Sequence, residues 1–408
     1  MFIKKTAALM ICAAMAAGMM PVMSVGAEEM PARPTDDLQE FDVVELEQAP
    51  DLNGYSAYRR NAGGSSEDLA FLKKTRGTYG YNDCLNSSDG ESRAAFYDKL
   101  WDIAADYWMG NISYTSNWGY NYIATVSYSS YGLSEEAAEE VYNDFLYDNT
   151  CFFFLKNGVL RGSGYFYLWL NDEYLDASVK NDYQDQVIDF VTSTVDTAIA
   201  DSWCDYEISY SIMKELNSKM TYSYSSPGVP NDATWAHNIM GPILYGEGVC
   251  ESYSKTYQAL MTYAGMDCIY VKGTGNGGGH AWNAAKMDNG SYYYIDTTWN
   301  DSWGGTYYFA EGTTKFLKDH AVDSSTVSGF ERLYPMPSVP AANYTHTAHT
   351  YSLGDVNCDG KVNNKDVVII ARYYNNSSTR IKKANADFDK NGSINLKDAV
   401  AVARSILS

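Results

Sequence analysis

Two twelve-residue segments near the C-terminal end place the strongest constraint on what this chain can fold into. "DVNCDGKVNNKD" (355–366) and "DFDKNGSINLKD" (387–398) both carry oxygen-bearing side chains at positions 1, 3, 5, 9 and 12, and glycine at position 6. Ca²⁺ takes about six to eight oxygen ligands, and the glycine permits the sharp turn that wraps a loop around the ion. Two such loops in register, each followed by a short apolar run, predict two calcium sites rather than two Asp/Asn-rich turns.

The expected ligands are the side chains at those five positions and the main-chain carbonyl at position 7. In the first loop they are Asp355, Asn357, Asp359, Asn363 and Asp366, with the carbonyl of Lys361. In the second loop they are Asp387, Asp389, Asn391, Asn395 and Asp398, with the carbonyl of Ser393. Aspartate at position 12 replaces the glutamate usual in EF-hands.

Residues 353–408 as a whole resemble a dockerin, the cellulosomal module whose two loop–helix repeats bind a cohesin on a scaffoldin. The resemblance implies a small all-α fold with two bound Ca²⁺ and a cohesin as partner. In that family, partner choice lies largely at positions 10, 11, 17 and 18 of each repeat. These positions are Asn364, Lys365, Ala371 and Arg372, then Leu396, Lys397, Ala403 and Arg404. Lys and Arg recur in both repeats, so a basic edge facing a polar or acidic cohesin surface is expected.

A second constraint comes from "GEGVCESYSKTYQALM" (246–261), which places a cysteine directly before an amphipathic run. The pattern predicts a helix with Cys250 in its first turn, continuing to about Ala264 and stopped by Gly265. The positive end of a helix dipole favours the thiolate, so Cys250 is a candidate nucleophile. The alternative is a small apolar residue that starts a core helix.

The next fifty residues favour the nucleophile. "GGGHAWNAAKMDNGSYYYIDTTWND" (277–301) holds His280 and Asp296 on two strand-like runs around a turn. A two-residue loop would put the two side chains on opposite faces, whereas a three-residue loop, 288–290, would pair Trp282 with Asp296. His280 would then lie diagonal to Asp296 on the same face, within side-chain reach.

The stretches "WAHNIMGPILYGEGVC", "GVCESYSKTYQALMTYAGMDCIYVKG" and "GHAWNAAKMDNGSYYYIDTTWND" resemble the transglutaminase-like superfamily of papain-like folds over about 205–310. The resemblance implies an α+β core in which the Cys250 helix packs on an antiparallel sheet. It implies Cys250 as nucleophile, His280 as general base and acid, and Asp296 as the residue that orients the imidazole. The backbone N–H of Cys250 is the expected oxyanion donor, with a second donor from a side chain in 235–238. His237 is the alternative base, but it lacks a strand partner.

In such a site the thiolate attacks an amide carbonyl and forms a thioester, which passes to water or to an amine. Because cross-linking requires a dry, amine-selective channel, the favoured activity is peptidase-like hydrolysis of a protein or peptide. The alternatives are a glutamine cross-linking transglutaminase and a non-catalytic binding module. A glycoside hydrolase needs a pair of carboxylates in a cleft, and no convincing pair stands outside the calcium loops.

The remaining sequence indicates an exported protein of several parts. A basic start, a short apolar run and small residues at 25–27 predict a signal peptide. The net charge of −21 argues against nucleic acid and anionic membrane as partners, and a secreted, cellulosomal location with a role in cell-wall polysaccharide degradation follows from the dockerin. No disulfide pairing is predicted for the six cysteines left after cleavage. The expected parts are a signal peptide (1–27), an acidic leader that need not fold (28–55), an N-terminal α+β extension (56–204), the catalytic core (205–332), a flexible linker (333–352) and the dockerin (353–408).

Within the extension, helical spacing predicts helices over 92–109, 134–149 and 182–203, and a further helix follows over 205–220. Ser134 is the expected N-cap of the second helix. Asn157-Gly158, flanked by apolar runs, predicts the turn of a short hairpin over 151–162. The extension shows no catalytic signal and is interpreted as scaffold or as a groove wall.

Overall fold

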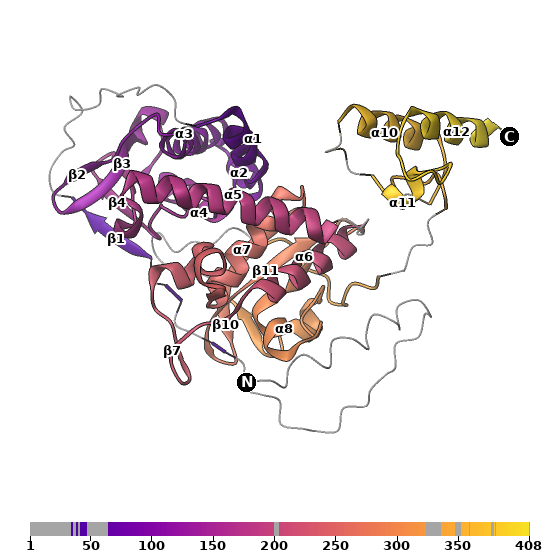
Figure 1. Cartoon of the computed structure of the whole chain (residues 1–408). Coiled ribbons are helices and arrows are strands. Elements are labelled where there is room, and N and C mark those ends of the chain that lie inside the picture. The colour runs from indigo at the N-terminus through magenta and orange to yellow at the C-terminus, as the bar shows by residue number, and fades with distance from the viewer. Residues whose placement is uncertain are drawn as a thin grey trace. The chain divides into compact units, whose positions relative to one another are not determined.

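The computed structural model describes residues 34–35, 38–39, 41–46, 64–199, 204–323, 336–346, 352–358, 360–376, 379 and 381–407 (Figure 1). The predicted signal peptide lies outside these residues. The fold is α+β with a helical C-terminal module, as predicted. Within the part of the chain that is described, no helix has both the length and the apolar character needed to cross a bilayer.

The N-terminal region combines helices with one five-stranded sheet. The helices are α1 (Ser66–Lys74), α2 (Tyr79–Leu85), α3 (Gly90–Trp108), α4 (Glu135–Asp148) and α5 (Ala177–Ile199). The strands are β1 (Asp42–Glu45), β2 (Thr115–Asn117), β3 (Tyr120–Ser127), β4 (Gly158–Gly162) and β5 (Tyr165–Trp169). The sheet order is β1-β4-β5-β3-β2, and only the β1–β4 pairing is parallel.

The predicted helices of this region are present, with ends shifted by a few residues. Ser134 caps α4 as expected, because its hydroxyl oxygen accepts a hydrogen bond from the backbone N–H of Ala137 at 3.2 Å. In α5 the residues Val187, Val191 and Val195 are buried at a spacing of four, which is the periodicity that predicted the helix.

The predicted hairpin turn at Asn157-Gly158 is wrong. The turn lies at 163–164, between the paired ends Gly162 and Tyr165, and Gly158 is the first residue of β4. A Cβ at Gly158 would lie 2.6 Å from the main-chain oxygen of Asp42, so glycine is required there by the close approach of β1. The Asn-Gly signal therefore reflects a tertiary contact and not a turn.

The interpretation of the leader as a segment that need not fold also needs correction. Residues 42–45 form β1, which pairs with β4 from Asp42 opposite Gly158 to Glu45 opposite Arg161. Phe41 is buried in the main hydrophobic core. The partner of this edge strand lies more than a hundred residues later in the chain. The acidic sequence around β1 therefore contains little local pattern from which a strand could be predicted.

The region that carries the predicted catalytic residues is a four-stranded antiparallel sheet with helices. The strands, in spatial order, are β12 (Tyr292–Ile295), β11 (Gly278–Lys286), β10 (Cys268–Gly275) and β13 (His320–Val322). Helix α7 (Cys250–Tyr263) packs on β10 and β11, and α6 (Asp205–Lys219) and α5 pack on α7. Shorter elements complete it: β6 (Thr221–Tyr222), β7 (Tyr224–Ser226), β8 (Val229–Pro230), β9 (Glu247–Gly248), α8 (Thr297–Trp303) and α9 (Thr313–Phe316).

One continuous hydrophobic core joins the two regions. It includes Phe71 and Val141 from the N-terminal region, Val191 from α5, and Ile212 and Tyr257 from the catalytic region. The predicted boundary between extension and core at residue 204 therefore crosses a shared core.

The predicted flexible linker is partly seated on the catalytic region. The backbone oxygens of Pro340 and Ala341 accept hydrogen bonds from the N–H groups of Thr313 and Thr314, and the N–H of Tyr344 donates to Ala310. The ring of Tyr344 lies 5.6 Å from that of Tyr206 on α6 in a stacked arrangement. Residues 336–346 are thus fixed by backbone and aromatic contacts that a Pro- and Thr-rich composition does not reveal.

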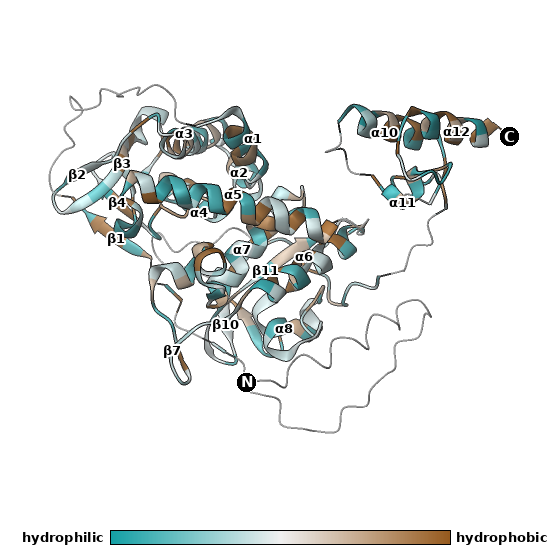
Figure 2. Ribbon diagram, viewed as in Figure 1, coloured by the Kyte–Doolittle hydropathy of each residue, from teal (hydrophilic) through white to brown (hydrophobic). Residues whose placement is uncertain are grey.

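The C-terminal module consists of α10 (Asn364–Asn375), α11 (Lys383–Ala386) and α12 (Leu396–Leu407). It has a hydrophobic core of its own, which contains Val356, Ile370, Ala399 and Val402. Figure 2 shows hydrophobic and hydrophilic stretches alternating along α10 and α12, as expected of amphipathic helices.

Candidate functional site

Cys250 is the first residue of α7, as the sequence predicted, and its side chain is fully buried. It belongs to a small buried cluster with Tyr147, Tyr270 and Ala281, the last being the residue after His280. Gly248 precedes it in β9, where a Cβ would lie 2.4 Å from the hydroxyl oxygen of Ser252. Glycine at position 248 therefore allows the backbone before Cys250 to pack closely against the Ser252 side chain in the first turn of α7.

The hairpin of β11 and β12 has the three-residue loop that the pairing argument required. Lys286 lies opposite Tyr292 and Asn283 opposite Ile295, so the loop is 288–290. Gly290 closes it with a φ of 79°, in the left-handed region. The register brings residues 280 and 296 to the same face.

His280 and Asp296 form a fully buried pair. Nε2 of His280 lies 2.9 Å from Oδ2 of Asp296, and both side chains have no exposed surface. Oδ1 of Asp296 accepts the backbone N–H of Trp299 at 3.0 Å, so the carboxylate also caps α8. Nδ1 of His280 is buried and makes no hydrogen bond to the described residues, which makes it the nitrogen suited to exchange a proton with a thiol. The ring of Trp299 stacks on the imidazole at 4.7 Å.

A second histidine reaches the same carboxylate, and sequence reasoning missed it. Nε2 of His320 lies 3.2 Å from Oδ2 of Asp296, and its Nδ1 lies 2.8 Å from Oδ1 of Asp319. His320 begins β13, which adds to the edge of β10 with His320 opposite Gly275. The residue stands forty positions after His280 with no motif around it, so only the sheet topology reveals its place.

The two histidines differ in their electrostatic environments. Burial lowers the pKa of His280, although the negative charge of Asp296 acts to raise it. Burial alone would also lower the pKa of His320, but hydrogen bonds to Asp296 and Asp319 raise it above its ordinary value. Although burial disfavours its charged form, the pKa of Asp296 is lowered by the charge and hydrogen bonds of the two histidines. The arrangement therefore favours a cation on His320 and a neutral, proton-accepting His280.

Glu251, the residue after the cysteine, fixes the start of α7. Its buried carboxylate accepts hydrogen bonds from the backbone N–H of Gln39 at 2.7 Å and from the Tyr270 hydroxyl at 2.9 Å. Nδ1 of His237 lies 2.7 Å from it, and Nζ of Lys255 lies 3.1 Å from it. Burial opposes ionisation, yet the charge of Lys255 and the hydrogen bond from His237 lower the pKa of Glu251 well below its usual range. His237, the alternative base, is thus engaged with Glu251.

Residues from the leader lie directly against these groups. The backbone oxygen of Pro34 accepts a hydrogen bond from Nε1 of Trp299 at 2.9 Å. Thr35 packs so closely that a Cβ at Gly278 would lie 2.5 Å from its hydroxyl oxygen. Leu38 packs on the buried cluster that contains Cys250. These contacts contribute to the complete burial of the candidate catalytic side chains.

The side chains expected to supply a second oxyanion donor point elsewhere. Nδ2 of Asn238 donates to the Tyr174 hydroxyl at 3.4 Å, while its Oδ1 accepts the N–H of Met240 at 2.8 Å. His237 is likewise paired to a carboxylate, and the backbone N–H of Cys250 in the first helical turn stays a prediction as oxyanion donor.

A cavity of about 330 Å³ lies away from this site. It is polar and is lined by residues that include Tyr79, Asp83, Asp148, Asp267 and Lys286. Because Lys286 lies at the opposite end of β11 from His280, the cavity lies toward that end of the sheet.

The C-terminal loops have the donor set that calcium prefers. The carboxylates of Asp387, Asp389 and Asp398 lie within 4.8 Å of one another. Gly360 and Gly392, at position 6 of each loop, have φ values of 80° and 84°, which is the conformation the loop requires there. The residues present therefore fit Ca²⁺, whereas Asp359 of the first loop lies outside the described residues.

The eight candidate cohesin-contacting positions lie on α10 and α12. Six side chains are exposed: Asn364, Lys365, Arg372, Leu396, Lys397 and Arg404. Ala371 and Ala403 are half-buried. The exposed basic residues are available to a partner on both helices.

Comparisons with known proteins agree with this architecture. The model of the transglutaminase-like superfamily matches residues 193–297, and that of the dockerin type I domain matches residues 353–407. Among solved structures, one described as a TGase is 12% identical with a TM-score of 0.27, and the alignment covers 33% of this chain and 40% of that chain. A candidate cysteine protease from Cytophaga hutchinsonii is 18% identical with a TM-score of 0.22, over 27% of this chain and 37% of that chain. The chain thus spans well under half of either structure. No curated protein matches the sequence.

Proposed function

We propose that this protein is a secreted, cellulosome-associated cysteine hydrolase that cleaves amide bonds in proteins or peptides through a thioester. The observation that carries the proposal is the buried pair of His280 and Asp296, 2.9 Å apart, on the sheet against which the Cys250 helix packs. The transglutaminase-like match over 193–297 includes all three residues.

In the proposed reaction, Nδ1 of His280 accepts the thiol proton and Sγ of Cys250 bonds to the amide carbonyl carbon. The oxyanion that forms accepts the backbone N–H of Cys250. The C–N bond then breaks as His280 returns the proton to the leaving amine, which leaves a thioester. Water, deprotonated by His280, cleaves the thioester and restores the thiol.

Asp296 and His320 are proposed to prepare His280 for this role. The Asp296 carboxylate holds Nε2 of His280 in its protonated tautomer, which leaves Nδ1 to accept the thiol proton. His320 holds the other side of the same carboxylate oxygen and supplies a positive charge to it. Because that charge already balances Asp296, His280 is free to cycle between neutral and protonated forms.

The dockerin is proposed to attach the enzyme to a cohesin through the exposed positions of α10 and α12, with Ca²⁺ held by the two loops. The catalytic region would then act beside enzymes that degrade plant cell-wall polysaccharides, on wall proteins or on other components of the complex. The signal peptide would direct export of the chain and would then be removed.

The burial of the candidate catalytic side chains favours a second candidate, a binding module that has kept the residues without the activity. Alkylation by iodoacetamide, followed at each cysteine by mass spectrometry in the full mature chain, separates the two. Cys151 and Cys268 serve as internal controls, because burial raises the pKa of both thiols.

For a catalytic site we expect Cys250 to react faster than these controls below pH 8, and His280→Ala to remove the difference. Equal reactivity of the three thiols would favour the binding module. Incubation of active protein with peptides and a labelled amine then distinguishes the acceptor, since hydrolysis yields free acids whereas cross-linking yields labelled amides.

A further inference from the structure

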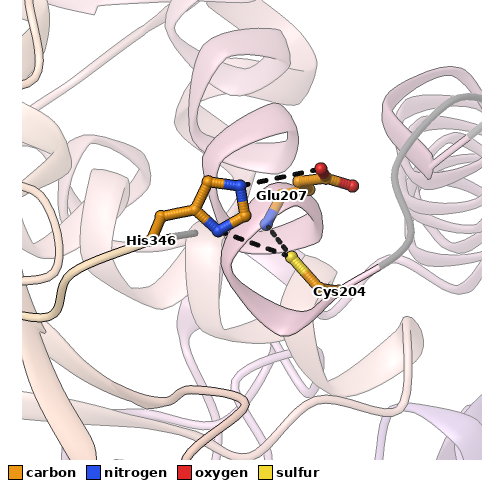
Figure 3. A group of neighbouring side chains, drawn as sticks. All are labelled: Cys204, Glu207 and His346. Carbon is orange, nitrogen blue, oxygen red and sulfur yellow. Dashed lines mark hydrogen bonds and ion pairs between the residues drawn. The ribbon is translucent and has the colours of Figure 1, made fainter. Parts of the chain in front are cut away.

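A group of metal-ligating side chains lies apart from the catalytic residues, at the start of α6 (Figure 3). Cys204 is the N-cap residue of that helix, and Glu207 stands one turn further along. His346, from the segment that follows the catalytic region, points its ring toward both of them. The cluster therefore joins residues more than 130 positions apart in the sequence.

The separations within the cluster suit a shared cation. Sγ of Cys204 lies 3.9 Å from Nδ1 of His346, and Nε2 of the same ring lies 3.7 Å from Oε1 of Glu207. One ligand atom can be chosen from each residue so that all three lie within 4.8 Å of one another. Zinc bonds of about 2.0–2.3 Å in tetrahedral geometry place ligand atoms about 3.4–3.6 Å apart. The 3.9 Å between Sγ of Cys204 and Nδ1 of His346 is close to that spacing and longer than a strong hydrogen bond, whereas the 3.7 Å contact of Glu207 is made to the other ring nitrogen, Nε2.

We propose that Cys204, Glu207 and His346 bind a zinc ion. The donor set of thiolate, imidazole and carboxylate is the one that Zn²⁺ takes in proteins, with a fourth position left to water or a neighbouring carboxylate. The metal bonds to Nδ1 of His346, the nitrogen that faces the cysteine. Glu207, whose side chain is 28% exposed, reaches the same ion by rotation of its flexible side chain.

The surroundings favour a cation at this point. Asp288 lies beside the cluster, where its carboxylate accepts the backbone N–H groups of Asp205 at 2.7 Å and Tyr206 at 3.3 Å. With Glu207, two carboxylates thus stand close to the Cys204 thiol. A zinc ion would displace the thiol proton and offset the negative charge of these carboxylates.

The imidazole is already oriented for binding. The His346 ring stacks on the ring of Tyr206 at 4.4 Å with an interplanar angle of 5°. Its side chain is 19% exposed, so an ion can reach it from solvent. Since His346 is the last residue of the seated segment 336–346, bound zinc would fasten the end of that segment to α6.

Cobalt titration of the full mature protein tests the proposal, after the C-terminal loops are saturated with Ca²⁺. A cobalt–thiolate bond gives a charge-transfer absorption band in the near ultraviolet, which hard oxygen sites do not produce. We expect one equivalent of Co²⁺ to generate the band and one equivalent of Zn²⁺ to abolish it. Cys204→Ser and His346→Ala should each lose the band, whereas the matched control Cys358→Ser, which removes a thiol from the C-terminal module, should retain it.

Two results would overturn the site: absence of the band in the wild type, or its survival in Cys204→Ser. His346→Ala, at a partly exposed position, keeps the test valid if loss of the buried Cys204 thiol impairs folding. Calorimetric titration with Zn²⁺ gives a second readout, in which His346→Ala should lower the stoichiometry by one ion and leave the remainder unchanged.

Discussion

Replacing His320 by glutamine tests the electrostatic arrangement around Asp296. The imidazole makes contacts of 3.2 Å and 2.8 Å to two carboxylates, and its side chain has no exposed surface. Hydrogen bonds to charged groups contribute about 1.5–3 kcal/mol each, and removal of one partner from a buried ion pair costs about 3–5 kcal/mol. Glutamine can replace one of the two hydrogen bonds but not the charge. We therefore expect His320→Gln to lower the free energy of unfolding by about 3 kcal/mol near pH 6.

The loss should depend on pH with a definite sign. The raised pKa of His320 means that its stabilisation is complete below the unfolded histidine pKa of about 6.5 and disappears as the pH rises through the folded-state value. The difference between wild type and variant should therefore shrink from pH 6 toward alkaline pH. All nine tryptophans precede residue 304, so urea unfolding followed by tryptophan fluorescence reports on the N-terminal and catalytic regions and not on the C-terminal module.

His346→Gln, measured in the absence of zinc, is the matched control, because it removes a partly exposed imidazole that does not contact Asp296. It should change the free energy of unfolding by less than 1 kcal/mol, about the size of a surface ion pair. If the free energies of unfolding of His320→Gln and wild type differed by the same amount at pH 6 and at alkaline pH, the assignment of the cation to His320 would be refuted.

The remaining predictions concern the leader strand, calcium and access to the cysteine. Gly158→Ala should destabilise the protein by about 1–3 kcal/mol in urea unfolding because its Cβ would meet the β1 backbone at 2.6 Å, whereas Gly305→Ala, with open space around it, should be nearly neutral. Chelation of Ca²⁺ should reduce helical circular dichroism and abolish cohesin binding without changing tryptophan fluorescence. A change in tryptophan fluorescence on chelation would contradict the independence of the calcium loops from the rest of the chain. Asp398→Ala removes the acceptor of three backbone N–H groups and should therefore weaken calcium binding. A chain that starts at residue 41 should react faster with iodoacetamide at Cys250 than the full mature chain, and an unchanged rate would show that the leader contacts do not limit access.

Local patterns in the sequence predicted much of the fold. Helix α4 with its Ser134 cap follows from short-range spacing alone. For the hairpin, the sequence offered a two-residue or a three-residue loop, and the structure has the three-residue loop at 288–290. That loop predicted that His280 and Asp296 lie within side-chain reach, because strand register decides which side chains share a face; the structure shows them 2.9 Å apart.

Features that depend on distant pairing escaped prediction. β1 needs β4, and His320 needs the edge of β10, so neither carries a recognisable pattern in its own neighbourhood. The Asn-Gly signal at 157–158 gave a wrong prediction for the same reason, because Gly158 is required by the close approach of β1 and not by a turn.

The hydrophobic core shared by the N-terminal and catalytic regions determines how the chain can be divided for study. A fragment that begins at residue 205 would lack Val187, Val191 and Val195 of α5. It would expose the side chains that share their core, including Ile212 and Tyr257, at a cost of about 1.5–3 kcal/mol for each side chain fully exposed. Such a fragment should aggregate, although it contains nearly all of the transglutaminase-like match. A cut after residue 346 instead leaves the main core and the core of the C-terminal module whole, and it separates the transglutaminase-like part of the chain from the dockerin.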